Sequence, residues 1–299
     1  MGAPRARASR RRRRFPSRAA RLRRAAALLA ILAAGCAEQA PQPRGERIVS
    51  VAPNLTEMLF AAGAAGQVVG VSEYSDWPEQ ARSLPRIGDA FRLDYERIVA
   101  LEPSVAVVWA TGTPAGVAAR LESLGMRVVG IPTHRLEDVA TGLEALGELA
   151  GTQAVARAAA AGFRERIAGL RDAYRERPRL RVFIQIDDAP LFTVGGGHLI
   201  TEIVGLCGGV NVFADAADLA LPVDLESVIA RAPEVILSAD DGDPVAYWAR
   251  FPDLPAVSGG HVFRAPADKL SRPSPRIAEA AAEVCALFDR ARSGDGAAG

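Results

Sequence analysis

Aromatic side chains are scarce in this chain, and several of them occur where predicted strands end. The 299 residues include three Trp, four Tyr and ten Phe. Trp109 ends a strand-like run, Tyr74 follows another, Phe192 shortly precedes three glycines, and Phe91 lies in a loop. Strand carboxyl ends face the crevice of an open parallel sheet, where aromatic faces suit a large flat ligand. These residues predict a binding cleft; the alternative is that each fills core or hinge space.

The side chains that usually perform catalysis or hold metals form no recognisable pattern. The sequence has neither a Gly-x-Ser-x-Gly elbow nor a phosphate loop ending in Gly-Lys-Ser/Thr. His134, His198 and His261 are too far apart in sequence to form a helix-borne metal pair. A structural or surface role is the simpler interpretation of each histidine. We therefore expect no enzymatic activity, no metal site and no cofactor.

Two glutamates occupy equivalent places in a repeated pattern. Glu96 begins the run Glu-Arg-Ile-Val-Ala before Pro103, and Glu226 begins Glu-Ser-Val-Ile-Ala before Pro233. Each lies at a predicted helix start, where the helix dipole stabilises an acidic side chain. Alternatively, each lobe presents one carboxylate to arginines of a symmetric partner. The residues alone leave both interpretations open.

The elements that position these side chains alternate between strand-like and helix-like runs. Strands are predicted at residues 48–51, 68–71, 105–109 and 128–131, and helices at 56–63, 95–101 and 115–124. Runs of β-branched residues separated by helices are typical of parallel βα units. The first predicted helix has a counterpart at residues 200–204, followed by glycine at the same distance. Together with the repeated glutamates, this predicts two similar lobes.

A long helix is predicted between the lobes. The segment from Thr152 to Arg177 lacks proline and has apolar side chains every three or four residues, which is typical of an amphipathic helix. The predicted fold class is therefore α/β, with two βα lobes of parallel sheets joined by one long α-helix and a ligand cleft between them. The expected segments are an N-terminal lobe at 47–150, the connecting helix at 151–178, a C-terminal lobe at 179–290 and a disordered tail at 291–299.

The first 36 residues have the features of a signal peptide. Residues 1–24 carry eleven arginines, residues 1–36 carry no acid, and the apolar run at 25–34 is too short to span a bilayer comfortably. The segment ends in Leu-Ala-Ala-Gly-Cys, which resembles a bacterial lipobox and predicts lipidation of Cys36. Ordinary cleavage near Ala34 is the alternative. Residues 37–46 are polar and contain proline, which predicts a flexible tether.

The charge balance and the remaining cysteines follow from this assignment. Beyond residue 24 the chain holds 25 basic and 35 acidic side chains, a net charge of −10, which argues against nucleic-acid binding. An exported chain meets an oxidising compartment. We therefore expect Cys207 and Cys285, both in apolar helix-like settings, to form a disulfide; two buried free thiols are the alternative.

Six segments together carry a family resemblance. They are residues 47–57, 70–78, 96–103, 181–185, 207–213 and 272–277. With them, residues 47 to about 289 resemble the class III periplasmic binding proteins of ABC importers, which have a helical-backbone fold. The block Tyr-Ser-Asp-Trp-Pro at 74–78 and the Ser-Pro-Arg at 274–276 are similar to the cobalamin-binding branch.

The resemblance assigns roles to named residues. It implies that the ligand is contacted by Tyr74, Trp109, Phe192 and Arg272, with Pro53 and Asp268 at neighbouring cleft positions. It also implies that Glu96 and Glu226 dock onto arginine pockets of the transmembrane subunits, and that Cys207 and Cys285 form the family's disulfide.

The function implied by the resemblance is capture without chemistry. A monomeric periplasmic lipoprotein would bind cobalamin or a related corrinoid and deliver it to a permease. Ala90, beside Phe91, and Ala220 and Lys269 stand where the family places tryptophan, and Ile186 replaces a phenylalanine. A protein that binds haem or an iron-siderophore chelate is therefore the alternative. A chelatase on the same scaffold would need histidines or carboxylates converging in the cleft.

Overall fold

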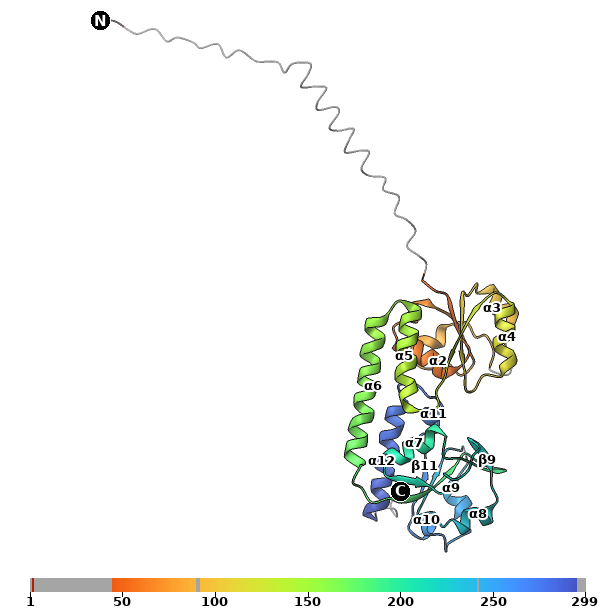
Figure 1. Ribbon diagram of the computed structural model, residues 1–299, viewed down its shortest axis with the longest axis vertical. Helices are drawn as coiled ribbons and strands as arrows, with labels where there is room; N and C mark the ends of the chain where they lie inside the picture. The colour runs from red at the N-terminus through yellow and green to blue at the C-terminus, as the bar shows by residue number, and fades with distance from the viewer. Residues whose placement is uncertain (1, 3–44, 90–91, 241, 295–299) are drawn as a thin grey trace. The chain divides into compact units, whose positions relative to one another are not determined.

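The computed structural model describes residue 2 and residues 45–89, 92–240 and 242–294 (Figure 1). The predicted signal peptide, with the lipidation site at Cys36, lies outside these residues. So do most of the predicted tether, Ala90, Phe91 and the end of the predicted tail. Of the tether, Glu46 is described, and its carboxylate pairs with Arg127 at 2.5 Å.

The N-terminal lobe is built on a parallel four-stranded sheet in the order β2-β1-β3-β4. Its strands are β1 (Ile48–Ser50), β2 (Val68–Val71), β3 (Val105–Trp109) and β4 (Arg127–Ile131). Helices α2 (Pro53–Ala61) and α5 (Leu136–Ala150) cover one face, and α3 (Tyr95–Ala100) and α4 (Ala115–Ser123) cover the other. Successive strand residues point to opposite faces, so both faces carry apolar side chains. Short 3-10 turns at Ala65–Gln67 and Glu79–Ser83 complete the lobe.

The C-terminal lobe repeats the plan with the parallel order β11-β10-β5-β8. Its strands are β5 (Leu180–Gln185), β8 (Gly209–Asn211), β10 (Val235–Ser238) and β11 (Val262–Arg264). Helices α7 (Leu199–Leu206) and α12 (Ile277–Ser293) cover one face, and α8 (Leu225–Ala230), α9 (Pro244–Trp248) and α10 (Pro255–Ser258) cover the other. The predicted α/β class with two lobes is confirmed.

Some boundaries differ from those expected. Helix α2 begins at Pro53 rather than at residue 56, because the fixed φ of proline suits the first turn of a helix. Helix α12 continues to Ser293, so residues 291–293, which were assigned to a disordered tail, are helical. The structure adds a small antiparallel sheet made of β6 (Asp187–Asp188), β7 (Leu191–Val194) and β9 (Ala220–Pro222), and the short helix α11 (Ala267–Leu270). Of these elements, β7 contains the strand-like run at residues 192–194.

Helix α6 (Gln153–Tyr174) joins the lobes and packs along α5 and against α12 (Figure 1). Its buried face carries Ala156, Ala160, Phe163 and Ile167, which belong to one apolar core that continues through both lobes. Close contact with α5 requires Gly147, because a Cβ there would lie 2.2 Å from the Cβ of Ala156. No helix in the described part of the chain, α6 included, has both the length and the apolarity needed to cross a membrane.

The duplication is visible in matching hydrogen bonds. Arg47, just before β1, donates to the carbonyl oxygens of residues 101 and 102, which follow α3. Arg181, in β5, donates in the same way to residues 231 and 232, which follow α8. The turns that receive them also match, since Glu102 and Ala232 have φ angles of 48° and 42°. The two lobes therefore share local bonding as well as strand order.

A disulfide connects two helices of the C-terminal lobe. Cys207, directly after α7, is bonded to Cys285 in α12, and both residues are fully buried. The two cysteines are 78 positions apart in sequence. Such a crosslink stabilises chiefly by restricting the unfolded chain, and a loop of this length corresponds to about 4 kcal/mol in the chain-entropy model.

Removing this crosslink is expected to lower stability by up to about 4 kcal/mol. The double variant Cys207→Ala/Cys285→Ala should unfold at a lower urea concentration than the oxidised wild type, and the wild type in dithiothreitol should resemble the variant. Two titratable thiols from these residues in the denatured, unreduced protein would instead support the free-thiol alternative.

Candidate functional site

A cavity of about 640 Å³ lies between the lobes. Trp109 and Thr133 line it from the N-terminal lobe. The C-terminal lobe contributes a mainly apolar wall, made of Ile186, Phe192, Val194, His198, Leu199, Ile200, Ala220, Ala239, Ala267, Asp268, Leu270, Ser271 and Pro273. Small-molecule sites have volumes of roughly 300–1,000 Å³ and the same character, with apolar walls and a few polar groups.

Trp109 is held in place from two directions. It is the last residue of β3, at the carboxyl end of the strand, where the sequence predicted a cleft. Its indole Nε1–H donates to the buried hydroxyl of Thr133 at 2.6 Å, and its backbone N–H donates to Thr113 at 3.1 Å. A Cβ on Gly112 would lie 2.2 Å from the indole ring, so glycine is required there. The ring therefore has a fixed position at the cavity.

Phe192 reaches the same cavity from the C-terminal lobe. It lies in β7, paired with Asp187 of β6 and Pro222 of β9. Its carbonyl oxygen accepts a hydrogen bond from the backbone N–H of Ile186 at 2.9 Å. Ile186 and Ala220 also line the cavity. Lys269 does not, and its ammonium group binds Glu283 at 2.6 Å.

Tyr74 and Pro53 are not among the residues that line the cavity. Tyr74 is 74% exposed and has a φ of 61°, in a loop that follows β2. The loop is fixed from below by buried hydroxyl groups, since Ser75 bonds to Thr56 at 3.0 Å and to Ser72 at 3.1 Å. The tyrosine is thus displayed on a rigid loop.

Arg272 joins the two lobes. Its guanidinium contacts Asp76 of the N-terminal lobe at 2.5 Å and Asp268 of the C-terminal lobe at 2.9 Å. Asp268 lines the cavity and also pairs with Arg276 at 3.2 Å. Burial opposes ionisation of Asp76, but the hydrogen bond and charge of Arg272 outweigh it and hold the pKa of Asp76 below its usual value.

A buried carboxylate forms the centre of this cluster. Glu57, in α2, has a side chain only 2% exposed. It accepts two hydrogen bonds from Arg276, at 2.5 and 2.9 Å, and one from Ser274 at 2.5 Å. The paired hydrogen bonds with Glu57 raise the pKa of Arg276. In the sequence, Glu57 and Arg276 are noticeable only as members of the segments that carry the family resemblance. Their spacing does not indicate that the two side chains are in contact across the lobes.

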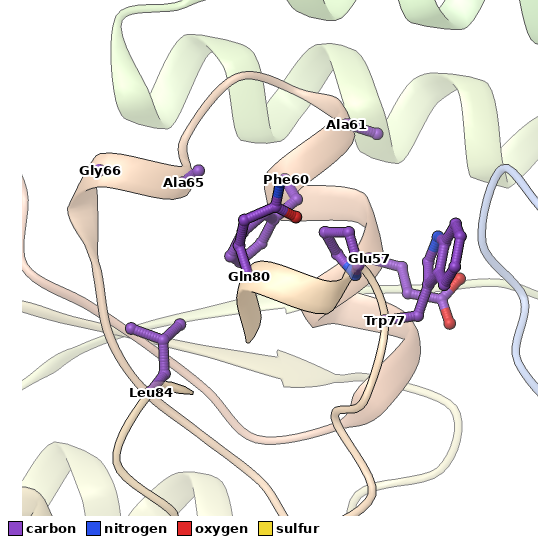
Figure 2. Close-up of a pocket in the computed structure, with 9 residues that line it drawn as sticks. Glu57, Phe60, Ala61, Ala65, Gly66, Trp77, Gln80 and Leu84 are labelled. Carbon is purple, nitrogen blue, oxygen red and sulfur yellow. The ribbon is translucent and has the colours of Figure 1, made fainter. Parts of the chain in front are cut away.

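A second cavity, of about 680 Å³, lies beside Glu57 but within the N-terminal lobe (Figure 2). Phe60, Trp77, Gln80 and Leu84 are among its lining residues. Figure 2 shows the Trp77 ring next to the Glu57 carboxylate, and the same ring lies 5.1 Å from the Arg276 guanidinium. No described residue of the C-terminal lobe lines it. The cavity between the lobes is therefore the better candidate for a ligand that both lobes hold.

His198 has the structural role that the sequence analysis favours, and it also lines the cavity, which the sequence does not predict. It precedes α7, and its Nδ1 accepts a hydrogen bond from the backbone N–H of Ile200 at 3.1 Å. Desolvation lowers the pKa of His198, so the neutral form is favoured. Among the residues that the structure describes, no group of three or more His, Cys, Asp or Glu side chains is placed to hold a metal ion.

Glu96 and Glu226 occupy the same position in equivalent helices. Asp94 caps α3 by accepting from the third backbone N–H that follows it, and Asp224 caps α8 in the same way. Both glutamates are exposed, and within the described residues neither forms an ion pair. One turn later each helix exposes an aliphatic side chain, Val99 or Ile229. Each lobe thus presents a carboxylate beside an apolar group.

Neutralising the buried carboxylate should loosen the connection between the lobes. Glu57→Gln removes the nearer of the two carboxylates that pair with the largely buried Arg276 and leaves Asp268, at 3.2 Å, as its counter-charge. We therefore expect a loss of about 3 kcal/mol in the free energy of unfolding, measured with urea. The matched control is Glu144→Gln on α5, whose carboxylate pairs with Arg164 at 2.6 Å but is 36% exposed. Its loss should stay below about 1 kcal/mol. Equal losses would show that Glu57 has no special role.

Comparisons with known proteins agree with this geometry. The family model described as "Periplasmic binding protein" matches residues 48–268. A vitamin B12-binding protein of Vibrio parahaemolyticus is 35% identical over 250 residues, covering 82% of this chain and 90% of the relative. The crystal structure of the periplasmic vitamin B12 binding protein of Vibrio cholerae has a TM-score of 0.76 at 35% identity, covering 83% of this chain and 98% of that one.

A relative with a different ligand shares the fold. The periplasmic heme-binding protein of Roseiflexus has a TM-score of 0.72 at 27% identity and covers 83% of this chain and 99% of that one. Two lobes, a connecting helix and an apolar cavity between them thus occur together with a family match over most of the chain. The chain belongs to the family of periplasmic binding proteins.

Proposed function

We propose that this chain is the substrate-binding component of an ABC importer and that it binds cobalamin or a related corrinoid. The observation that carries the proposal is the cavity of about 640 Å³, which Trp109 lines from one lobe and Phe192 from the other. The relatives that share about a third of its residues are vitamin B12-binding proteins. A corrin ring is broad and largely apolar on its faces, which suits such walls.

Binding would proceed by capture, without a chemical step. The apolar wall of the C-terminal lobe and the fixed indole of Trp109 would exclude water from the ligand's faces. Arg272 is not among the residues that line the cavity, but it would hold Asp268, which does line it, through its Nη2 group, while its Nη1 group binds Asp76. Because α6 and a shared core join the lobes, we expect only small movements on binding.

Delivery would use the matched surfaces of α3 and α8. We propose that Glu96 and Glu226 dock onto arginine pockets of the transmembrane subunits, each with its aliphatic neighbour in contact. Two equivalent surfaces on two similar lobes suit a permease with two similar halves. The chain would act as a monomer in the periplasm, after export by its signal peptide and attachment to a membrane through a lipid on Cys36.

A second ligand class has specific support. Ala220 and Ile186 line the cavity where the cobalamin-binding branch has bulkier aromatic residues. A cavity with fewer aromatic walls would also accept haem or an iron-siderophore chelate, and the Roseiflexus relative is a heme-binding protein. Corrinoid binding remains the first proposal because the relatives with the higher identity bind vitamin B12.

Titration of the purified protein with cyanocobalamin tests the ligand. We expect quenching of Trp fluorescence at micromolar ligand or below, and an affinity about tenfold weaker in Trp109→Ala by calorimetry, a loss of about 1.4 kcal/mol. Trp77→Phe is the control, because Trp77 lies outside the cavity. Absence of corrinoid binding together with tight binding of hemin or a siderophore chelate would select the second ligand class.

Uptake of labelled cobalamin by cells tests the docking surfaces. Glu96→Ala/Glu226→Ala should abolish uptake and leave the affinity of the purified protein unchanged, since neither residue lines the cavity. The control is Glu122→Ala/Asp253→Ala, which removes one exposed acid from each lobe and should leave uptake intact. Equal loss of ligand affinity in the Glu96/Glu226 variant would contradict the docking role.

A further inference from the structure

His198 caps helix α7 through one ring nitrogen, Nδ1, while the other ring nitrogen, Nε2, has no partner among the described residues. It lies immediately before α7, and its side chain is partly buried. One ring nitrogen, Nδ1, accepts a hydrogen bond from the backbone N–H of Ile200. His198 lines the cavity between the lobes, and it also lines a neighbouring pocket together with His134 and Arg135. For Nε2 no hydrogen-bond partner is present within the described residues.

The bond to Ile200 decides where the imidazole carries its proton. A backbone N–H can only donate, so Nδ1 must offer a lone pair. A neutral imidazole has one protonated and one unprotonated nitrogen, and the proton therefore lies on Nε2. If Nδ1 were protonated instead, two N–H groups would point at each other and the first turn of α7 would lose its cap.

This protonation state limits what the ring can bind. Nε2–H is a hydrogen-bond donor and has no lone pair free for a metal. Coordination of a cobalt or iron ion by Nε2 would require the proton to move to Nδ1 and the cap to break. An N–H facing an apolar cavity is costly when a ligand displaces water and leaves it without a partner. Leu199, Ile200 and Val194 supply such a setting around His198.

We propose that His198 contacts the ligand through Nε2–H, donating to a carbonyl oxygen such as those of the amide side chains around a corrin ring, and does not coordinate the central metal. The inference rests on the proposed function for the identity of the ligand. It makes His198 a specificity-determining residue, because a bound ligand must place an acceptor opposite Nε2.

Two corrinoids that differ at the metal separate donation from coordination. Both axial positions of cobalt are filled in cyanocobalamin, whereas aquocobalamin carries an exchangeable water. The wild type should bind both with affinities within about twofold and should leave the visible spectrum of aquocobalamin unchanged. His198→Asn should weaken both about fivefold, the effect of one lost hydrogen bond.

Asparagine is chosen because its side-chain oxygen can replace Nδ1 as the helix cap, so the variant should keep its melting temperature. His134→Asn is the matched control, since His134 does not line this cavity. A shifted aquocobalamin spectrum that His198→Asn abolishes would show coordination and overturn the proposal. Unchanged affinity for both corrinoids in His198→Asn would overturn it as well.

Failure of the proposed function would give a different result. The wild type would then bind neither corrinoid, and hemin would replace them as the probe. An identical Soret band for wild type and His198→Asn would support donation by His198, and a change in that band would show coordination. In the ligand-free protein, the nitrogen-15 shifts of His198 should show the proton on Nε2, and a proton on Nδ1 would contradict the inference.

Discussion

The carboxylate of Glu57 is buried on α2 of the N-terminal lobe, yet its partners, Arg276 and Ser274, belong to the C-terminal lobe. A buried charge is tolerated only when it is paired and hydrogen-bonded, so any separation of the lobes here would leave Glu57 without these partners and would remove one of the two carboxylates that pair with Arg276. The same arginine contacts Asp268, which lines the ligand cavity. The distance between Trp109 and the opposite wall is therefore set partly by an ion pair outside the cavity. The continuous core along α5, α6 and α12 also holds the two lobes together. The ion pair and this core therefore favour a binding site that is already formed before the ligand binds.

Duplication explains why surfaces far apart in sequence match so well. Each lobe begins with an arginine that holds the turn after a short helix, and each of those helices is capped by an aspartate and carries an exposed glutamate in its first turn. In each lobe the aspartate fixes the start of the short helix, and the arginine fixes the turn that follows its last residue. The lobes differ elsewhere, because the antiparallel sheet that carries Phe192 belongs to the C-terminal lobe and has no counterpart among the described residues of the N-terminal lobe. The exposed surfaces of α3 and α8 are thus alike, while the walls of the cavity differ.

Much of the fold could be predicted, because strands and helices leave periodic patterns of apolar residues in the sequence. Runs of β-branched residues gave β1 to β4, and the spacing of apolar residues gave α6. The sequence predicts Trp109 and Phe192 as cleft residues, because one ends a predicted strand and the other shortly precedes three glycines.

Other features depend on contacts between residues far apart in the chain, which leave no local pattern in the sequence. The pairing of Glu57 with Arg276 joins residues more than two hundred positions apart, and β6 is only two residues long. The place of His198 at the cavity was missed for the same reason, because only the folded chain shows that one nitrogen is used by the backbone while the other is at the cavity.

The disulfide gives the C-terminal lobe the connectivity of a closed ring. The segment from Cys207 to Cys285 includes β8 to β11 and most of α12, and its two ends are covalently joined. It also includes the exposed turn at Gly242 and Asp243, the kind of loop at which proteases act. A single cut there would open the ring without releasing a fragment, because both pieces would remain attached through sulfur. The nicked chain would keep its core strands in place and migrate as two pieces only after reduction. The disulfide would thus hold the chain together after a break in its backbone as well as in the intact protein.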